Sequence, residues 1–261
     1  MENENYTDKK EEFSPMKSIL GLLSFSTIIP IKIFTPVEYM ARLVWCWPFL
    51  HLFIGILLAG CGIIFAEFLH LNSFFVAVLV YAILILISGY NHLDGVADMA
   101  DGVMVHGSPE KKMSVVKDSS VGVGGIATLF IVALLTIAGL NTVLGYGFIM
   151  GIIICEMVSK TSLLSTALTS HPSVPGIGSH FIFSTNSLNY SVSTLIVAII
   201  CYLLGGVAGL VGLLGAIIGG FLISIIARVH FGVANGDVLG MSNEVGRLFS
   251  LLFMSAALYF L

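Results

Sequence analysis

Long and nearly uninterrupted apolar runs constrain the fold of this chain more than any other feature. Between residues 190 and 229 the sequence is almost entirely apolar, which is long enough for two helices joined by a tight turn near Gly205–Gly209. Hydrophobic residues make up 57% of the 261 residues, charged residues only 10%, and the mean hydropathy is +1.02. This composition excludes an ordinary soluble globular protein and indicates an integral membrane protein.

The apolar runs predict an all-α integral membrane protein, a polytopic helical bundle of about seven transmembrane helices. A helix needs about 20 apolar residues to cross the hydrocarbon, and most of the runs have this length. The short alternating segments of a transmembrane β-barrel do not occur. Ser18–Ile29 is short and stops at Pro30, so we expect an N-terminal interfacial or re-entrant helix there. The expected spans are 43–66, 72–90, 123–143, 145–165, 190–207, 209–229 and 245–261.

We expect a single polytopic membrane domain over 15–261, preceded by a disordered polar tail over 1–14 that carries both charge signs. The glycine pairs Gly205/Gly209 and Gly215/Gly219 are spaced for close helix contact and permit a homo-oligomer. The four cysteines lie in apolar runs without a Cys-x-x-Cys pair, which predicts buried free thiols rather than disulfides or a zinc site. They are Cys46, Cys61, Cys155 and Cys201.

The basic residues between the expected spans predict the orientation. If the segment after Ser88 is cytoplasmic, alternation of the spans places all of them on the cytoplasmic side, and the opposite connections contain none. We therefore predict a multi-pass protein of the cell membrane with its chemistry facing the cytoplasm, on loops 90–122, 169–187 and 230–247. Most acidic residues, Glu156 among them, lie in or beside these segments. The basic residues are Arg42, Lys111, Lys112, Lys117, Lys160, Arg228 and Arg247.

Directly after the apolar run that ends at Ser88, three aspartates follow one another at spacings of four and three: Asp94, Asp98 and Asp101. On a helix, at roughly 100° per residue, they fall within an arc of about 60°. Carboxylates on one stripe repel each other, and hard oxygen ligands of this kind suit Mg²⁺ or Mn²⁺. The alternative is a solvated acidic helix start, which fits poorly beside so apolar a chain.

The rest of the first loop adds groups that suit phosphate. The glycines of Gly122–Gly125 free backbone N–H groups at the start of the next helix, a geometry that accepts phosphate, although glycine is also common at membrane helix contacts. The lysines would neutralise phosphate charge or act as positive-inside anchors. Carboxylates, lysines and glycines together favour metal-assisted phosphate chemistry. Protease motifs are lacking, and so few basic residues argue against nucleic-acid binding.

The aspartate segment resembles a known family signature. Residues 92–102, which read His-Leu-Asp-Gly-Val-Ala-Asp-Met-Ala-Asp-Gly, resemble the His-x-Asp-Gly-x-Ala-Asp-x-x-Asp-Gly signature of the cobalamin synthase family, the adenosylcobinamide-GDP ribazoletransferases. The resemblance spans nearly the whole chain, with further matches at residues 23–30, 42–55, 117–125 and 235–244.

The chain departs from the family pattern at three places. The family usually has paired glycines before the signature histidine, where this chain has Gly89 followed by Tyr90 and Asn91. Lys160 stands where an arginine is expected, and lysine cannot make the bidentate fork of arginine. Asn235 stands where a threonine is expected. None of these departures removes a metal ligand that the resemblance implies.

The resemblance implies the last step of cobalamin assembly. The hydroxyl of α-ribazole, or of its phosphate, attacks the phosphate attached to cobinamide in adenosylcobinamide-GDP, and GMP leaves, with Mg²⁺ required. The catalytic, metal-binding carboxylates would be Asp94, Asp98 and Asp101, with Asp237 as a further metal ligand. His92 would be either a base or a hydrogen-bond partner behind the site. The substrate-binding residues would be Lys111, Lys112, Lys117, Asp118, Gly122 and Glu244.

Two other functions match part of the pattern. A CDP-alcohol phosphotransferase signature begins as Asp98–Gly102 does, but the Ala-Arg pair expected soon afterwards is absent, because residues 103–106 read Val-Met-Val-His. That enzyme would release CMP rather than GMP. An ion-coupled transporter would use intramembrane carboxylates, but inverted repeats are not visible and the charges cluster in one-sided loops. Ion flux without nucleotide turnover would favour that function.

Overall fold

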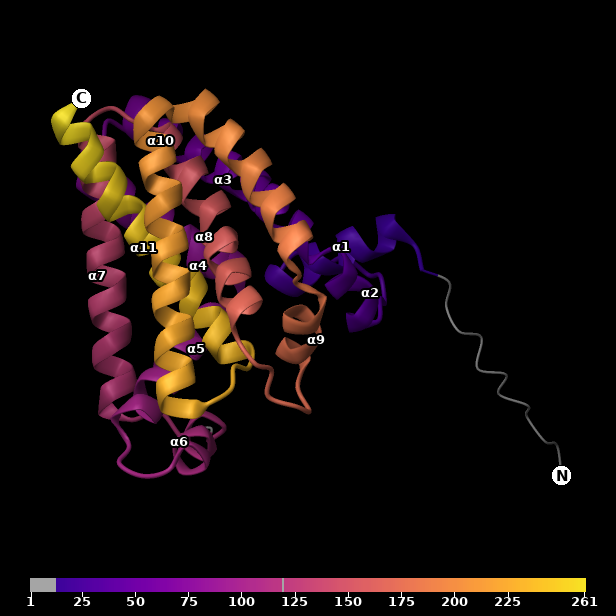
Figure 1. Cartoon of the computed structure of the whole chain (residues 1–261). Coiled ribbons are helices and arrows are strands. Elements are labelled where there is room, and N and C mark those ends of the chain that lie inside the picture. Colours follow the sequence, from indigo (N-terminus) through magenta and orange to yellow (C-terminus); the bar gives the residue numbers. More distant parts are fainter. Residues whose placement is uncertain (1–12, 119) are drawn as a thin grey trace, which may run out of the picture.

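The computed structural model describes residues 13–118 and 120–261, and these residues form an all-α bundle (Figure 1). The predicted tail 1–14 lies outside the described residues except for Phe13 and Ser14, and the Ser14 side chain caps the first helix. The helices are α1 (Pro15–Ser26), α2 (Val37–Arg42), η1 (Val44–Cys46), α3 (Trp47–Ile63), η2 (Ile64–Phe68), α4 (Ser73–Ser88), α5 (Asn91–Met104), α6 (Pro109–Val116), α7 (Val123–Gly145), α8 (Met150–Thr169), α9 (Ile177–Ser184), α10 (Ser187–Phe231) and α11 (Gly236–Phe260).

The described chain is long and apolar enough to cross a membrane several times. Four helical stretches are long and apolar enough to be membrane spans. They are Val44–Phe68, which comprises η1, α3 and η2, and the helices α7, α8 and α10. The bent pair α4 and α5 makes a fifth if it counts as one span. Each of the seven expected spans lies on a helix, so the prediction of an all-α chain with several helices able to cross a membrane is confirmed. The count of about seven transmembrane helices stays a prediction, because α11 and the separate α4 do not meet the criteria for a span. The N-terminal helix α1 has only 12 residues, too few to span a bilayer.

Helix α10 contains two of the expected spans. It runs for 45 residues but breaks at Gly206, where φ is 53° and ψ is −135°, within the turn expected near Gly205–Gly209. Figure 1 shows the two arms as an antiparallel hairpin. The glycines that we considered for contact between copies lie against helices of the same chain. A Cβ on Gly215 would lie 2.5 Å from the Phe249 carbonyl oxygen, and one on Gly219 would lie 3.3 Å from Gly246 Cα.

A sharp break separates the apolar α4 from the aspartate-bearing α5. Gly89 and Tyr90 both adopt left-handed backbone conformations, with φ of 64° and 65°, and the two helix axes differ by 91°. Glycine adopts this conformation freely, but a residue with a Cβ pays roughly 1–2 kcal/mol for it. Tyr90 stands where the family pattern would have a second glycine, so this departure carries a conformational cost. Because of this bend, the helix that carries the aspartates runs nearly perpendicular to α4.

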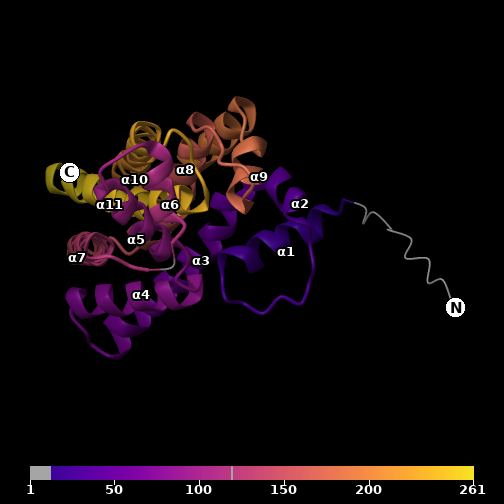
Figure 2. The ribbon, with the colours of Figure 1, turned by 90° about the horizontal axis from the view of Figure 1, so that it is seen from below.

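Helix α8 forms the centre of the bundle. Every residue from Gly151 to Ala167 is buried, and the helix packs against α3, α10 and α11. Viewed from below, α8 lies among the other helices, whereas α1 and α2 lie to one side (Figure 2). The two buried cysteines, Cys155 and Cys201, are free, and Cys46 and Cys61 are free but only half-buried.

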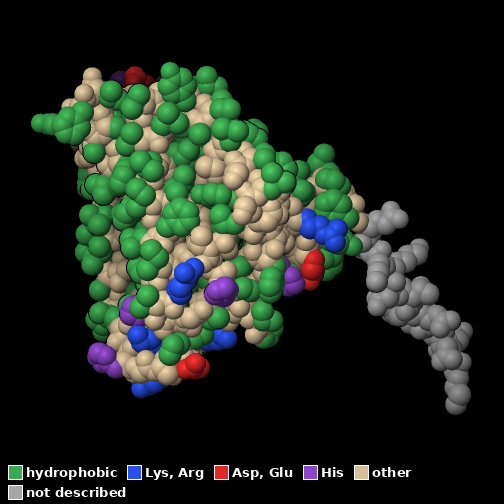
Figure 3. Space-filling model, viewed as in Figure 1, with side chains coloured by type: hydrophobic (Ala, Val, Ile, Leu, Met, Phe, Trp, Pro, Cys, Tyr) green, Lys and Arg blue, Asp and Glu red, His purple; other side chains and the backbone are tan. Residues whose placement is uncertain are grey.

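Charged side chains gather at one end of the molecule. Figure 3 shows hydrophobic side chains over most of the visible surface and Lys, Arg and His side chains around the lower end, where α6 lies. Two basic residues do not lie between the helices at the surface, where the sequence predicts them. Lys160 is 0% exposed and Arg247 is 2% exposed, because both are paired with polar groups inside the bundle.

The predicted orientation is testable by cysteine labelling. Asn72 and Ser108 are both exposed, one before α4 and the other before α6, on connections that we expect on opposite sides of the membrane. In a background without the four native cysteines, Asn72→Cys should react with an impermeant maleimide only from outside. Ser108→Cys should react only after the cells are opened. Labelling of Ser108→Cys in intact cells would contradict the orientation.

Candidate functional site

The three aspartates lie along one face of α5, as their spacing predicts. Asp94 is exposed, and Asp98 and Asp101 are half-buried. The opposite face of the helix is apolar and includes Val96, at 0% exposure, and Met99, at 1%. Because α5 packs against α6, α7 and α11, its acidic face is held at the junction of these helices. The segment expected as loop 90–122 is therefore built largely from α5 and α6.

Asp101 is fixed by two glycines at the start of α7. Its carboxylate oxygens accept hydrogen bonds from the backbone N–H groups of Gly122, at 2.6 Å, and Gly125, at 2.8 Å. A Cβ on either glycine would lie 2.6 Å from the Asp101 carboxylate, so side chains there would block the contact. These N–H groups, expected to bind phosphate, thus bind a carboxylate of the chain itself. An anion at a helix N-terminus is favoured for the same electrostatic reason in both cases.

A backbone contact brings Asp237 to the same place. A Cβ on Gly95 would lie 2.5 Å from the carbonyl oxygen of Asp237 and 2.9 Å from its Cα, so α5 and the first turn of α11 touch through their backbones. Only a glycine on α5 permits this approach. The Asp237 carboxylate accepts a hydrogen bond from Asn235 Nδ2 at 2.6 Å, and the Asn235 side chain also caps α11. Two segments more than a hundred residues apart in sequence therefore share one acidic region.

The second and third expected loops also meet beside this region. His171 and Ser173 pair with Ala234 through two backbone hydrogen bonds of 2.7 Å, which form a short parallel bridge. A Cβ on Gly178 would lie 2.5 Å from the backbone nitrogen of Gly236, so α9 approaches the start of α11 equally closely. Most of the third loop is helical, since α11 begins at Gly236.

The carboxylates influence one another electrostatically. Burial and the neighbouring charges of Asp94, Asp237 and Asp101 raise the pKa of Asp98 to about 6. Burial and the charge of Asp94 also raise the pKa of Asp237, against the opposing hydrogen bond from Asn235. Repulsion among carboxylates raises their pKa values, and a nearby cation lowers them again. The four aspartates thus form a region of unbalanced negative charge.

The donor set of this region fits a hard divalent cation. Carboxylate oxygens are the ligands that Mg²⁺ takes in proteins, and their mutual repulsion is relieved by positive charge between them. Among the residues that the structure describes, no three Asp, Glu, His or Cys side chains converge on one point. A cation would therefore require some side chains to rotate, and Asp94 is exposed and has room to do so.

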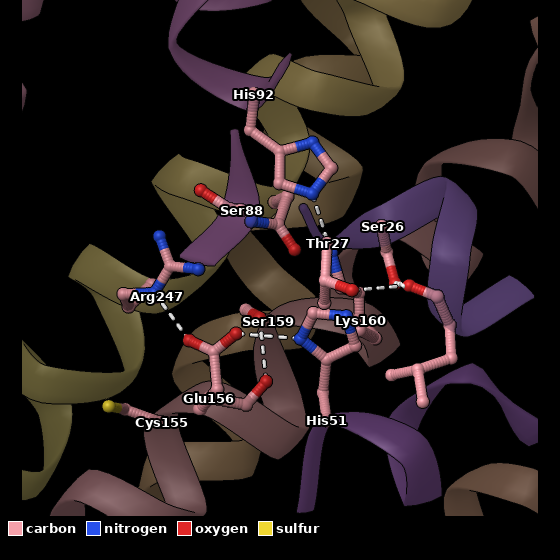
Figure 4. A network of polar contacts seen from close by, with 12 residues as sticks. Ser26, Thr27, His51, Ser88, His92, Cys155, Glu156, Ser159, Lys160 and Arg247 are labelled. Carbon is pink, nitrogen blue, oxygen red and sulfur yellow. Dashed lines mark hydrogen bonds and ion pairs between the residues drawn. The ribbon is translucent and has the colours of Figure 1, made fainter. Parts of the chain in front are cut away.

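His92, at the start of α5, contacts a buried lysine. Lys160 Nζ on α8 lies 2.7 Å from His92 Nε2 (Figure 4). The same Nζ lies 5.3 Å from the centre of the Trp47 ring, within the range of a cation–π contact. This pairing ties α5 to the centre of the bundle. The family pattern has an arginine at position 160. Here Lys160 contacts an imidazole nitrogen rather than a carboxylate.

A chain of buried ionic groups continues one helical turn away on α8. The Glu156 carboxylate contacts His51 Nδ1 at 2.7 Å and Arg247 Nε at 2.9 Å (Figure 4). Arg247 also pairs with Glu244, whose other oxygen accepts from Asn243 at 3.0 Å. With Lys160, the set contains two acidic and two basic side chains and is balanced in charge. An unbalanced charge at this depth would be costly.

A cavity of about 450 Å³ lies beside the acidic region. Its lining residues come from α1, α3, α5, α8, α9 and α11, and they include His92, Asn91 and Asp237 as well as an aromatic group of Phe25, Trp47 and Phe181. A second cavity, of about 420 Å³, is lined by Asp94, Ala97 and Val121 and also reaches Asn91. Asn91 thus lines both cavities, which meet α5 near its start.

The other predicted substrate-binding residues lie in different surroundings. Lys111 and Lys117 are exposed, and Lys112 contacts His230 Nδ1 at 2.8 Å. The positive charge of Lys117 lies near enough to Asp237 to oppose, in small part, the rise in the pKa of that carboxyl group. Asp118 accepts hydrogen bonds from the Ser120 backbone and hydroxyl. Glu244, by contrast, is buried against Arg247, apart from the cavity with the aromatic group.

Sequence reasoning did not single out the polar network of α8 or the aromatic group. A signal existed for the first, because Glu156 and Lys160 are ionisable residues inside an apolar run, and such residues mark function or pairing by default. No sequence signal joined Phe25, Trp47 and Phe181, which come from three separate helices. Their meeting depends on tertiary packing alone.

Comparison with known proteins gives the family of this chain. A model of the cobalamin-5-phosphate synthase family matches residues 18–255. This chain belongs to that family. The adenosylcobinamide-GDP ribazoletransferase of Methanococcoides burtonii is 34% identical over 222 residues, which cover 80% of this chain and 82% of that protein. The one of Methanosarcina mazei is 31% identical over 262 residues, covering 93% and 91%. No solved structure matches this chain. Family membership sets aside the phospholipid and transporter alternatives.

The buried network predicts a specific pattern of stability. Arg247→Met would leave the two buried carboxylates of Glu156 and Glu244 with only one positive charge, that of Lys160. We expect the free energy of unfolding to fall by about 3 kcal/mol or more. The double variant Arg247→Met/Glu244→Gln again balances one acid against one base, and it should recover most of the loss. Thermal unfolding in detergent measures both. A double variant no more stable than Arg247→Met would contradict the proposed charge balance.

Proposed function

We propose that this chain is an adenosylcobinamide-GDP ribazoletransferase that works at the aspartate face of α5. A hydroxyl of α-ribazole, or of its phosphate, attacks the phosphorus attached to cobinamide. A new phosphorus–oxygen bond forms to ribazole, the bond between that phosphorus and the GMP oxygen breaks so that GMP leaves with the electron pair, and the proton of the attacking hydroxyl passes to water. Family membership supports this reaction, and the grouping of four carboxylates beside two cavities supports its location.

The observation that carries the location is the backbone contact between Gly95 and Asp237. It joins the α5 stripe to α11 and sets Asp94, Asp98, Asp101 and Asp237 within electrostatic reach of one another. We propose that these four hold Mg²⁺. When bound, Mg²⁺ would offset negative charge on the reacting phosphate and on the leaving GMP. Asp101 is the most rigid of the four, since two backbone N–H groups orient its carboxylate.

His92 acts as a hydrogen-bond donor in this proposal. A lysine ammonium has donors only, so with Lys160 charged the His92 Nε2 atom must accept. The ring hydrogen then sits on Nδ1, and His92 donates from that atom rather than serving as a base. Lys160 is the positioning residue that fixes this tautomer. Of the two roles that the sequence left open for His92, the structure favours the second.

Basic residues beside the site suit a substrate that carries a nucleoside diphosphate. We propose that Lys111, Lys112 and Lys117 neutralise its phosphates, with Asp118 and Gly122 shaping the approach to α7. A direct substrate contact of Glu244 is not part of this proposal because of its pairing with Arg247. We propose that this end of the bundle faces the cytoplasm, and the distribution of basic residues between the expected spans supports this orientation.

Asp98→Asn tests the proposed site. The change keeps the side chain's size but removes one negative charge, and GMP release from adenosylcobinamide-GDP, α-ribazole and Mg²⁺ should fall at least about a hundredfold. The variant should still insert, because it makes the segment less polar. Glu110→Gln, an exposed acid on the neighbouring α6, is the matched control and should turn over normally. Near-normal GMP release by Asp98→Asn would remove this residue from the site.

A further inference from the structure

The cavity of about 450 Å³ has two chemically different parts. Phe25, Trp47 and Phe181 form a continuous aromatic group, with ring centres 5.0 Å apart for Trp47 and Phe181, 5.3 Å for Phe25 and Phe181, and 6.1 Å for Phe25 and Trp47. Trp47 and Phe181 are 2% and 1% exposed and form the base of this group, whereas Phe25 is 38% exposed. The other part is polar and contains His92 and Asp237.

Asp237 belongs to the acidic region and also lines the cavity, as does His92. A ligand in the cavity would therefore have one end beside the aspartates of the proposed metal site. Its other end would lie against aromatic rings. A flat aromatic group is the chemistry that such rings recognise, because the face of a base stacks favourably on an aromatic side chain. A ligand with a hydroxyl-bearing end and a flat aromatic end therefore matches both parts.

The volume of the cavity indicates which of the two substrates it can hold. Cavities of about 300–1,000 Å³ enclose drug-sized ligands, and 450 Å³ falls at the small end of this range. A nucleoside fits such a space, whereas a corrinoid joined to a nucleotide is several-fold too large. A lipid chain would also fit by volume, but it would place apolar atoms against the polar side chains of Asn91, His92 and Asp237 that line the cavity, which is unfavourable.

Resting on the proposed function, we propose that this cavity binds the acceptor nucleoside, with its aromatic base against Phe25, Trp47 and Phe181 and its ribose toward Asp237. Phe25 is the specificity-determining residue, because its ring is the most accessible of the three. Lys160, next to Trp47, contributes by holding that ring in place. The acceptor is thereby selected by the flat, apolar character of its base.

A kinetic split tests this assignment. Phe25→Leu keeps an apolar side chain but removes the flat ring, and it should raise the KM for α-ribazole about tenfold. The KM for adenosylcobinamide-GDP should stay within about twofold. Phe25→Tyr restores a flat ring and should keep the wild-type KM. Phe183→Leu is the matched control, because Phe183 lies on α9 with Phe181 but is 68% exposed and outside the cavity lining. Equal effects of Phe25→Leu and Phe183→Leu would overturn the assignment while leaving the proposed function intact.

A binding measurement separates the two proposals. The chain has two tryptophans, Trp45 and Trp47, so in full-length Trp45→Phe protein the emission reports on Trp47 alone. Titration with α-ribazole, without the corrinoid, should change this emission with saturation, and Phe25→Leu should weaken the apparent affinity about tenfold. Binding without any GMP release would defeat the proposed function but support the cavity. Emission unchanged by α-ribazole but quenched by a spin-labelled fatty acid would identify a lipid site and overturn the proposal.

Discussion

The arrangement of this protein depends on two ionisable side chains in the middle of a buried helix. Glu156 and Lys160 lie one turn apart on α8, where every neighbouring residue is buried, and each must find a partner because an unpaired charge there is costly. Glu156 meets His51 on α3 and Arg247 on α11, and Lys160 meets His92 on α5. Satisfying these two residues therefore fixes the positions of three helices around α8.

Close backbone packing then turns this framework into a site. With α5 and α11 both held to α8, Gly95 lets the two helices touch at Asp237, and the glycines at the start of α7 pack around Asp101. Four carboxylates are brought near one another, and burial together with the charges of the other three raises the pKa of Asp98. A group of carboxylates with a perturbed pKa is typical of a functional site, here one that suits a cation and an anionic substrate.

Local patterns predicted much of this fold, and tertiary contacts account for what they missed. Helix spacing correctly grouped Asp94, Asp98 and Asp101, and the apolar runs placed the helices, including the break at Gly206. For the glycines at the start of α7 the sequence left phosphate binding and helix contact open, because a sequence cannot show which anion a free N–H group binds. Arg247 was grouped with flanking basic residues, because only the folded bundle shows that it lies between two glutamates. The aromatic group had no sequence signal, since its members come from three helices.

Direct measurement of metal binding tests the central claim that α5 and α11 together form one cation site. Mn²⁺ binding to the full-length protein in nanodiscs can be followed by electron paramagnetic resonance, without substrate or turnover. Asp237→Asn should weaken Mn²⁺ binding at least about tenfold relative to the wild type. Glu67→Gln, which changes an exposed acid in η2, outside the acidic region, should leave binding unchanged. Mn²⁺ titrations of Asp237→Asn and wild type that overlay would contradict a site shared between the two helices.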